Sequence, residues 1–290
     1  MRPPGSTAPR RRPDVSTPMQ ELIDRALAED LGAGDLTSEA VVPRGATARG
    51  SIVQKGPGVI AGLDLAAAVF ERVDRTVTFE ATTAEGQWRE EGLVAGLAGA
   101  TASILAAERT AINFLGLLSG VATLTARYVK AVEGTGATIL DTRKTIPGLR
   151  TLQKRAVVTG GGSSHRAGLY DAILVKENHV RAAGGVGEAA RLALAAAGEG
   201  VVVEVEVESL DELDEALEAG ITRVLLDNMS LADQRAAVER TRGRAQLEAS
   251  GGVTLDSVRA VAETGVDFIS VGALTHSAPA LDLSLVLESG

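Results

Sequence analysis

Basic side chains of the kinds that bind small polyanions gather in one segment of an otherwise acidic chain. Between residues 141 and 179 the sequence has seven Lys and Arg residues and three Asp and Glu residues, although the whole chain has a formal net charge of −9. Such a local excess of positive charge fits a buried site for a small polyanion. A solvated basic face is the alternative, and it is less favoured because the charges alternate with apolar, strand-like runs.

Two glutamates alternate with valines in the run VVVEVEV at residues 201–207. Glu204 and Glu206 lie on one face of this predicted strand, because side chains repeat every two residues along a strand. If that face lines an interior, the carboxylates need cationic or metal partners, for which Lys144, Lys176 and a bound Mg²⁺ are candidates. An edge strand with solvated glutamates is the alternative.

Small residues follow the last two predicted strands, at 250–252 (SGG) and 270–273 (SVGA). Small side chains let backbone N–H groups approach a phosphate, and phosphosugar barrels often bind phosphate after their last two strands. Each loop alone could equally be a tight turn that binds nothing. The two loops together predict a phosphate site.

The sequence leaves the roles of two further basic segments undecided. Arg109 lies on the apolar stripe of a predicted helix, so its guanidinium must form an ion pair or reach into an interface or pocket. His165 and Arg166 follow three glycines at 160–162. These glycines allow close approach to a ligand, or they make a flexible loop.

A repeated strand-then-helix pattern in the second half must position these groups. Strands are predicted at 138–141, 172–175, 201–207, 223–227, 246–250 and 267–271. Ser209 with Glu212, Ser230, and Thr254 are expected to cap the helices between the last four strands. The pattern favours parallel strands wound into an incomplete β/α barrel, with an open doubly wound sheet as the alternative.

The first half predicts a smaller α+β sandwich domain. A helix is expected from Thr17 to about Asp30, strands within 46–97 around a helical patch at 63–72, and two helices at 101–118 and 119–133. The predicted division is a disordered tail at 1–18, an N-terminal domain at 19–118, a barrel at 119–275, and a C-terminal segment at 276–290 that packs back on the N-terminal domain.

Composition excludes several classes of function. The chain has 290 residues, 45% of them hydrophobic, and contains no cysteine, so a thiolate metal site is impossible and a cytoplasmic setting is expected. The longest apolar stretch, at 93–107, is too short and too rich in small polar residues to span a membrane. The negative net charge argues against a nucleic-acid partner.

The ordered motifs identify a family resemblance. The sequence resembles the quinolinate phosphoribosyltransferases in DTRKTIPGLR at 141–150, in the His-Arg and Lys-x-Asn-His segments at 165–166 and 176–179, and in EVEV at 204–207. Similar segments, such as ERTAINFL at 108–115, LDN at 226–228 and GVDFISVGALTHS at 265–277, extend the resemblance from about residue 20 to the end.

The resemblance implies roles for individual residues. Residues matching Arg143, Lys144, His165, Arg166 and Lys176 hold the carboxylates of quinolinate and the phosphates of phosphoribosyl pyrophosphate. Residues matching Glu206 and Asp227 engage ribose hydroxyls and Mg²⁺. With Lys144 they are the expected catalytic residues, while Thr142 and the loops of Ser250, Gly251, Gly252, Ser270 and Gly272 bind substrate. A homodimer or higher oligomer is implied, in which Arg109 reaches the neighbouring active site.

The implied reaction joins quinolinate to phosphoribosyl pyrophosphate with loss of CO₂ and pyrophosphate, which gives nicotinate mononucleotide for NAD biosynthesis. Four departures from the family pattern, at Gln153, Arg155, Ser164 and Glu177, are expected to lie at supporting or surface positions. Two rival functions remain open: a relative that uses another acid, such as nicotinate, and a non-catalytic phosphometabolite-binding module.

Overall fold

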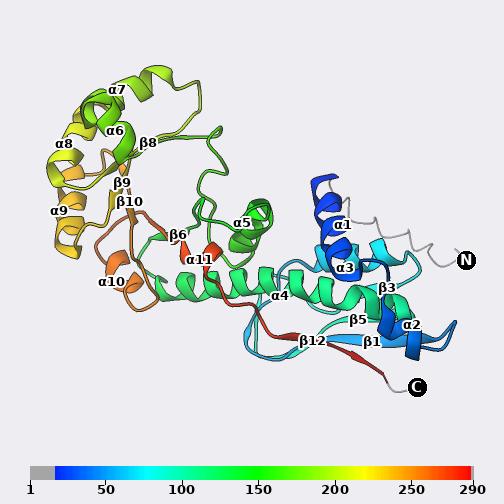
Figure 1. The fold of residues 1–290 in the computed structure, drawn as a ribbon. Helices are drawn as coiled ribbons and strands as arrows, with labels where there is room; N and C mark the ends of the chain where they lie inside the picture. The colour runs from blue at the N-terminus through cyan, green and yellow to red at the C-terminus, as the bar shows by residue number, and fades with distance from the viewer. Residues whose placement is uncertain (1–16, 289–290) are drawn as a thin grey trace, which may run out of the picture.

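The N-terminal part of the protein is a small antiparallel sheet with helices packed on it (Figure 1); the computed structural model describes residues 17–288. Its four strands lie in the order β12-β1-β5-β3, and β2 pairs separately with β4. The elements are α1 (Thr17–Leu31), α2 (Leu36–Val41), β1 (Thr47–Gln54), β2 (Gly58–Val59), α3 (Leu63–Val73), β3 (Thr78–Ala81), β4 (Trp88–Arg89) and β5 (Gly92–Ala100). The predicted first helix and α+β unit are confirmed, whereas residues 1–16 of the predicted tail lie outside the described residues.

One continuous helix, α4 (Thr101–Ala131), replaces the two helices predicted at 101–118 and 119–133. The predicted break was wrong because its small residues serve packing. The Ser119 hydroxyl hydrogen-bonds with the backbone N–H and carbonyl of Ala61, and a Cβ on Gly120 would lie 2.1 Å from the Pro279 carbonyl oxygen. The predicted domain division at 118/119 therefore falls inside this helix.

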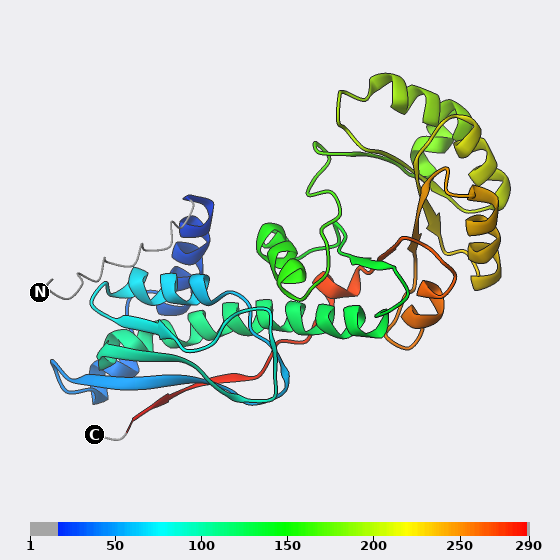
Figure 2. The ribbon, with the colours of Figure 1, turned by 180° about the vertical axis from the view of Figure 1, so that it is seen from behind.

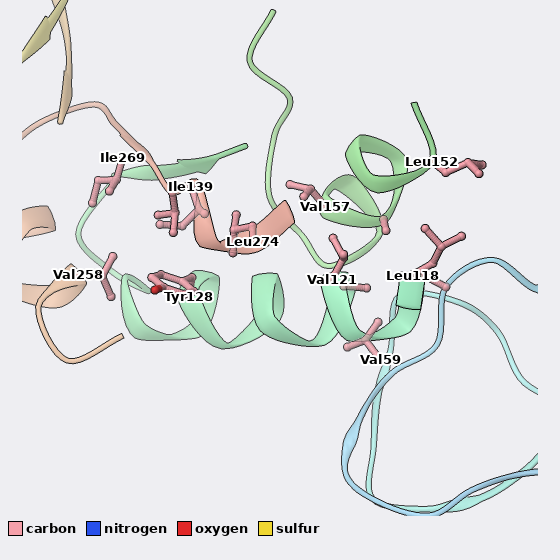
Figure 3. Packing of buried hydrophobic residues seen from close by; sticks show 14 of the residues in the cluster. Val59, Leu118, Val121, Tyr128, Ile139, Leu152, Val157, Val258, Ile269 and Leu274 are labelled. Carbon is pink, nitrogen blue, oxygen red and sulfur yellow. The ribbon is translucent and has the colours of Figure 1, made fainter. Parts of the chain in front are cut away.

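Helix α4 is the support that both parts of the fold share. Figure 3 shows Leu118, Val121 and Tyr128 along it, with Val59 of the N-terminal part on one side and Leu274 above the helix. By length and composition α4 could cross a membrane, but 61% of its most apolar window is buried inside the protein. Such burial is typical of a core helix.

Six parallel strands form the second sheet, in the order β6-β11-β10-β9-β8-β7. They are β6 (Thr138–Leu140), β7 (Ile173–Val175), β8 (Val203–Val207), β9 (Arg223–Asp227), β10 (Gln246–Ser250) and β11 (Phe268–Ser270). All six predicted strands are found. Connecting them are α5 (Arg150–Thr159), α6 (Glu177–Ala183), α7 (Val186–Ala196), α8 (Leu210–Glu218), α9 (Leu231–Thr241) and α10 (Val258–Ala262), and α11 (Ala273–His276) follows β11.

The sheet curves without closing, which makes it an incomplete barrel. Helices α7, α8 and α9 follow the outer side of the curve in both views (Figures 1 and 2). Within residues 17–288 no ladder joins the edge strands β6 and β7, and an isolated bridge from Leu140 to Ser163 lies beside β6 instead. A doubly wound sheet carries helices on both faces. The incomplete barrel is therefore confirmed over that alternative.

The two faces of the parallel sheet differ in chemistry. Val205, Val224, Leu226 and Ala249 are fully buried and belong to the face that packs against helices. The alternating positions point to the inner side of the curve, because side chains alternate along each strand. These inner positions carry Glu204, Glu206, Arg223, Asp227, Glu248 and Ser250. The fold thus places charged groups side by side on its concave face.

Two of the three predicted helix caps are confirmed. The Ser209 and Ser230 hydroxyls each accept a hydrogen bond at 3.2 Å, from the N–H of Glu212 and of Asp233. The prediction for Thr254 was wrong, because α10 begins only at Val258 and the Thr254 hydroxyl accepts from the Ser257 N–H across the preceding turn.

The chain ends by returning to the N-terminal sheet. Strand β12 (Leu283–Leu287) pairs antiparallel with β1, with Gly50 opposite Leu287 and Gln54 opposite Leu283. Just before it, the Leu281 N–H donates to the Gly116 carbonyl of α4. These bonds connect the end of the barrel to the sheet and helix of the first half.

Candidate active site

A polar cavity of about 540 Å³ opens at the carboxyl ends of the parallel strands. The predicted site residues that line it are Thr142, Arg143, Lys144, His165, Arg166, Lys176, Glu206, Asp227, Ser250, Gly251, Gly252 and Ser270. Leu174 and Leu225 add apolar surface. Seven separate segments of the sequence, at strand ends and in the loops that follow them, therefore bring cations, carboxylates and small residues to one place.

Two predicted residues lie outside the lining of this cavity. Gly272 is adjacent to it, since a Cβ on this glycine would lie 3.1 Å from Cδ of Lys144. Arg109 lies on α4 with 62% of its side chain exposed, and its guanidinium is 4.0 Å from the neighbouring Glu108 carboxylate. Arg109 therefore does not contribute to the cavity of its own chain.

Neither guanidinium group of the cavity forms an ion pair with a carboxylate of residues 17–288. Nε of Arg143 is buried and, among the described residues, has no hydrogen-bond partner. Burial and then the nearby Arg143 charge lower the pKa of Arg166. Two like charges held this close in a partly buried place favour binding of an anion between or beside them.

Two carboxylates of the neighbouring strands β8 and β9 lie in the cavity. Nζ of Lys176 lies 2.5 Å from the Glu206 carboxylate. Burial, followed by the charge of Glu206, raises the pKa of Asp227, which also accepts a hydrogen bond at 2.7 Å from the Asn228 side chain. A carboxylate pair that repels itself in this way suits a cation or hydroxyl donors.

The loops after β9 and β10 fit together at Gly251. Its φ is +100°, and a Cβ there would lie 2.2 Å from Oδ1 of Asn228, so glycine is required. Asn228 itself has φ +54°, and its N–H donates to the Ser250 carbonyl at 2.9 Å. The sequence analysis did not predict a supporting role for Asn228. The residue could have been recognised from its place directly after Asp227, at the end of a predicted strand.

A buried ion pair between Asp141 and Lys154 holds the loop of His165. Asp141 accepts hydrogen bonds from the His165 N–H at 2.9 Å and the Ser164 hydroxyl at 3.2 Å, and Lys154 donates to the His165 carbonyl at 3.1 Å. Burial raises the pKa of Asp141, and these bonds oppose that rise. The pair fixes where the His165 and Arg166 side chains begin.

Below the cavity, His165 contacts two carboxylates of the concave face. Its Nε2 lies 3.0 Å from Glu204 and 3.4 Å from Glu248, and Arg223 binds the same two carboxylates at 3.1 and 2.9 Å. Both glutamate side chains are at most 3% exposed. Strand β8 lies between β7 and β9, so the alternative of a solvated edge strand was wrong.

The same cluster could in principle hold a metal, because the ligand atoms of His165, Glu204 and Glu248 lie within 4.8 Å of one another. Arg223 already supplies positive charge to both carboxylates and stacks on the Phe268 ring, 4.3 Å from its centroid. We therefore treat the cluster as an ionic network of the protein.

The four departures from the family pattern lie at supporting or surface positions, as predicted. Gln153 is the one that connects to the cavity. Gln153 is fully buried; its amide accepts from the Ile146 N–H and donates to the Thr275 carbonyl, while the Thr275 hydroxyl donates to the Lys144 carbonyl at 2.7 Å. Ser164 supports Asp141, and Arg155 forms a two-pronged ion pair with Asp64 of α3. Glu177 pairs with Arg181 on α6.

Comparison with known proteins adds independent findings. The family model of the quinolinate phosphoribosyl transferase C-terminal domain matches residues 121–286, and that of the N-terminal domain matches residues 35–119. A carboxylating nicotinate-nucleotide pyrophosphorylase of Mycobacterium leprae is 45% identical over 275 residues, which cover 92% of this chain and 96% of that protein.

Other relatives agree in sequence and in structure. A probable carboxylating nicotinate-nucleotide pyrophosphorylase of Bacillus subtilis is 40% identical over 268 residues, with 92% of each chain covered. The solved structure of the nicotinate-nucleotide pyrophosphorylase from Francisella tularensis has a TM-score of 0.90 and 41% identity, and covers 93% of this chain and 96% of its own.

Proposed function

The chain belongs to the quinolinate phosphoribosyltransferase family, and on that premise we propose that it transfers phosphoribose from phosphoribosyl pyrophosphate to quinolinate. Decarboxylation then gives nicotinate mononucleotide, CO₂ and pyrophosphate, a step of de novo NAD biosynthesis. One observation carries the proposal: Arg143, Lys144, Arg166 and Lys176 converge on one cavity that also holds the Glu206 and Asp227 carboxylates.

The cations fit two anionic substrates. Quinolinate brings two carboxylates and phosphoribosyl pyrophosphate brings several phosphate groups, so the cavity must neutralise many negative charges. The unpaired Nε of Arg143 and the crowded Arg166 are available for this purpose. The Gly251 and Gly252 loop, where side chains do not block backbone N–H groups, suits the 5-phosphate.

The proposed chemistry follows from this arrangement. The pyridine nitrogen attacks C1 of the ribose as pyrophosphate leaves, through a state with positive charge on the ribose ring. The Glu206 or Asp227 carboxylate stabilises that charge, while Lys144 and the arginines orient the substrates and neutralise the leaving group. The ring nitrogen is then cationic and stabilises the carbanion left when the 2-carboxylate departs as CO₂.

The residues present fit a Mg²⁺ ion. Hard cations prefer carboxylate oxygens, and two such groups lie close together here, since burial and then the Glu206 charge raise the pKa of Asp227. Glu206 and Asp227 would hold the ion, and a bound Mg²⁺ supplies charge neutralisation for pyrophosphate.

Oligomerisation belongs to the same proposal. Arg109 is mostly exposed on α4, and its one ion pair within residues 17–288 is the 4.0 Å contact with Glu108, which is consistent with a role outside its own chain. We place it in the active site of a neighbouring subunit of a homodimer or larger assembly. A cytoplasmic location is likewise part of the proposal, since this chemistry needs soluble metabolites.

The decisive experiment measures products. The purified protein with quinolinate, phosphoribosyl pyrophosphate and Mg²⁺ should release CO₂ and pyrophosphate in equal amounts. Binding of both substrates without release would favour a non-catalytic binding module. Nicotinate in place of quinolinate tests the second rival, because a preference for the mono-acid would contradict a pocket built for two carboxylates.

A further inference from the structure

The concave face carries an ionic network that the proposed reaction does not use directly. Glu204 and Glu248 lie on β8 and β10, with Arg223 on the intervening β9 bonded to both. Arg223 does not line the cavity, whereas His165 does. The network therefore meets the substrate region through the His165 ring and the Glu248 side chain, whereas Glu204 and Arg223 lie behind them.

The charges of this network balance only when His165 is protonated. Two carboxylates give two negative charges, Arg223 gives one positive charge, and an imidazolium gives the second. Removing an ionised carboxylate from water without a partner is costly, and both carboxylates are nearly fully buried here. Burial lowers the pKa of His165, but the hydrogen bonds to Glu204 and Glu248 outweigh it and raise that pKa to about 9.

Other charged groups around His165 act on its backbone or its neighbours. Asp141 after β6 accepts its N–H and Lys154 of α5 donates to its carbonyl, while Arg166 follows it in the chain. On the far side of the ring the Arg166 N–H lies 2.7 Å from Nδ1. That contact belongs to the neutral ring. Protonation of Nδ1 requires this contact to open, and would then leave an Nδ1–H donor for an anion.

We propose that Glu204, Glu248 and Arg223 form a buried positioning network that fixes His165 as a cation at the floor of the cavity, facing the anionic substrate. Glu204 and Arg223 do not line the cavity, and the network acts on binding through the charge of His165. The inference rests on the proposed function in one respect, since it takes His165 as a contact of quinolinate or phosphate.

The first test removes one carboxylate without changing its shape. In Glu248→Gln the network loses a negative charge, so the pKa of His165 should fall toward its ordinary value. Calorimetry at pH 6.5 and pH 8.5 measures the quinolinate affinity of this variant. Between these two pH values its affinity should weaken about ten-fold more than that of the unchanged protein, since one pKa unit corresponds to a factor of ten. The unchanged protein should vary by less than about three-fold, because a His165 with a pKa near 9 stays mostly charged.

Two controls separate this effect from general ones. Glu263→Gln makes the same substitution in a surface pair with Arg259 and should keep the unchanged profile. In a His165→Gln background, Glu248→Gln should add no further pH dependence, because the coupled group is gone. A Glu248→Gln protein that loses only thermal stability and keeps the unchanged pH profile would overturn the proposal.

The second test follows the titration in the unchanged protein and uses a variant only to assign resonances. The ring resonances of His165, assigned by comparison with His165→Gln, are followed by NMR from pH 5.5 to pH 9.5 in the unchanged protein. They should remain at the protonated position through pH 8; titration near 6.5 contradicts the network's role. Failure of quinolinate to bind the unchanged protein at all would instead count against the proposed function, and the NMR result would still decide the inference.

Discussion

Two cavities, one at each end of β6, show how differently the same fold treats charged side chains. The larger, of about 1050 Å³, begins at Thr138 and is lined mostly by apolar residues and glycines of α4 and nearby loops. Its charged groups are engaged, since Arg127 lies over the Trp88 ring and Lys130 pairs with Glu133. The smaller cavity, of about 540 Å³, begins two residues after β6 ends and gathers several cations, among them Arg143, whose buried Nε has no hydrogen-bond partner within residues 17–288.

This difference shows that the charged side chains lining a cavity indicate a functional site better than the volume of the cavity does. In the larger cavity, Lys130 has an acidic partner and Arg127 lies over an aromatic ring, so the cations there already have contacts within the protein. In the smaller one, Arg143 and Arg166 lie close together and Asp227 faces Glu206, an arrangement that costs free energy until a ligand compensates it. Matched substitutions in the two cavities can break or sharpen this contrast.

The largest effect is expected from matched lysine substitutions. Lys144→Ala should lower kcat/KM for pyrophosphate release by about 10³-fold, because it removes a charge that orients and neutralises the substrates. The free energy of unfolding should change by less than about 1 kcal/mol, since Lys144 makes no ion pair within residues 17–288. Steady-state kinetics and denaturant unfolding measure the two quantities.

Lys130→Ala is the control for this change. Lys130 lines the larger cavity, its side chain is 79% exposed, and it pairs only with Glu133. It should retain nearly full activity. Equal losses of turnover in the two variants, or a loss in Lys144→Ala that follows stability alone, would remove the distinction between the cavities and favour a binding module.

An intermediate effect is expected from matched glycine substitutions. Gly251→Ala should lower kcat/KM by about 10²-fold, because its Cβ would displace Asn228 and with it the Asp227 carboxylate. Gly136→Ala in the larger cavity has a similar positive φ of +88° but no atom within 4 Å of the new Cβ. It should cost about 1–2 kcal/mol of stability from backbone strain and leave kcat/KM of the folded protein unchanged.

Activity per folded molecule, obtained from kinetics together with thermal melts, separates strain from displacement. A Gly136→Ala variant that loses activity as much as Gly251→Ala would show that backbone strain alone explains both losses. The close contact between Gly251 and Asn228 would then not contribute to activity.

Much of the fold was predictable because its signals are local. The strands at β9 and β10 have the predicted bounds, since short apolar runs end in polar residues and are followed by capped helices. The same regularity predicted which side chains share the carboxyl ends of parallel strands. Most of the cavity lining, from Thr142 to Ser270, follows from this rule.

What escaped prediction depends on contacts between distant segments. Ser119 and Gly120 suggest a break in sequence, yet Ala61 and Pro279 accommodate them within α4. The Arg223 bridge between Glu204 and Glu248 needs the register of three strands, which no local pattern supplies. Arg109 illustrates a further limit, because its proposed partner lies on another chain.

The smallest effect is expected from matched threonine substitutions. Thr275→Val removes the hydroxyl that donates to the Lys144 carbonyl at 2.7 Å, so kcat/KM should fall about five-fold for a loss near 1 kcal/mol. Thr138→Val lines the larger cavity and should stay within about two-fold of the unchanged protein. Because Thr275 does not line the smaller cavity, a selective loss there would show that the backbone position of Lys144, and not its charge alone, is part of what distinguishes the two cavities. Equal activity in both threonine variants would mean that Lys144 reaches the substrate without this support.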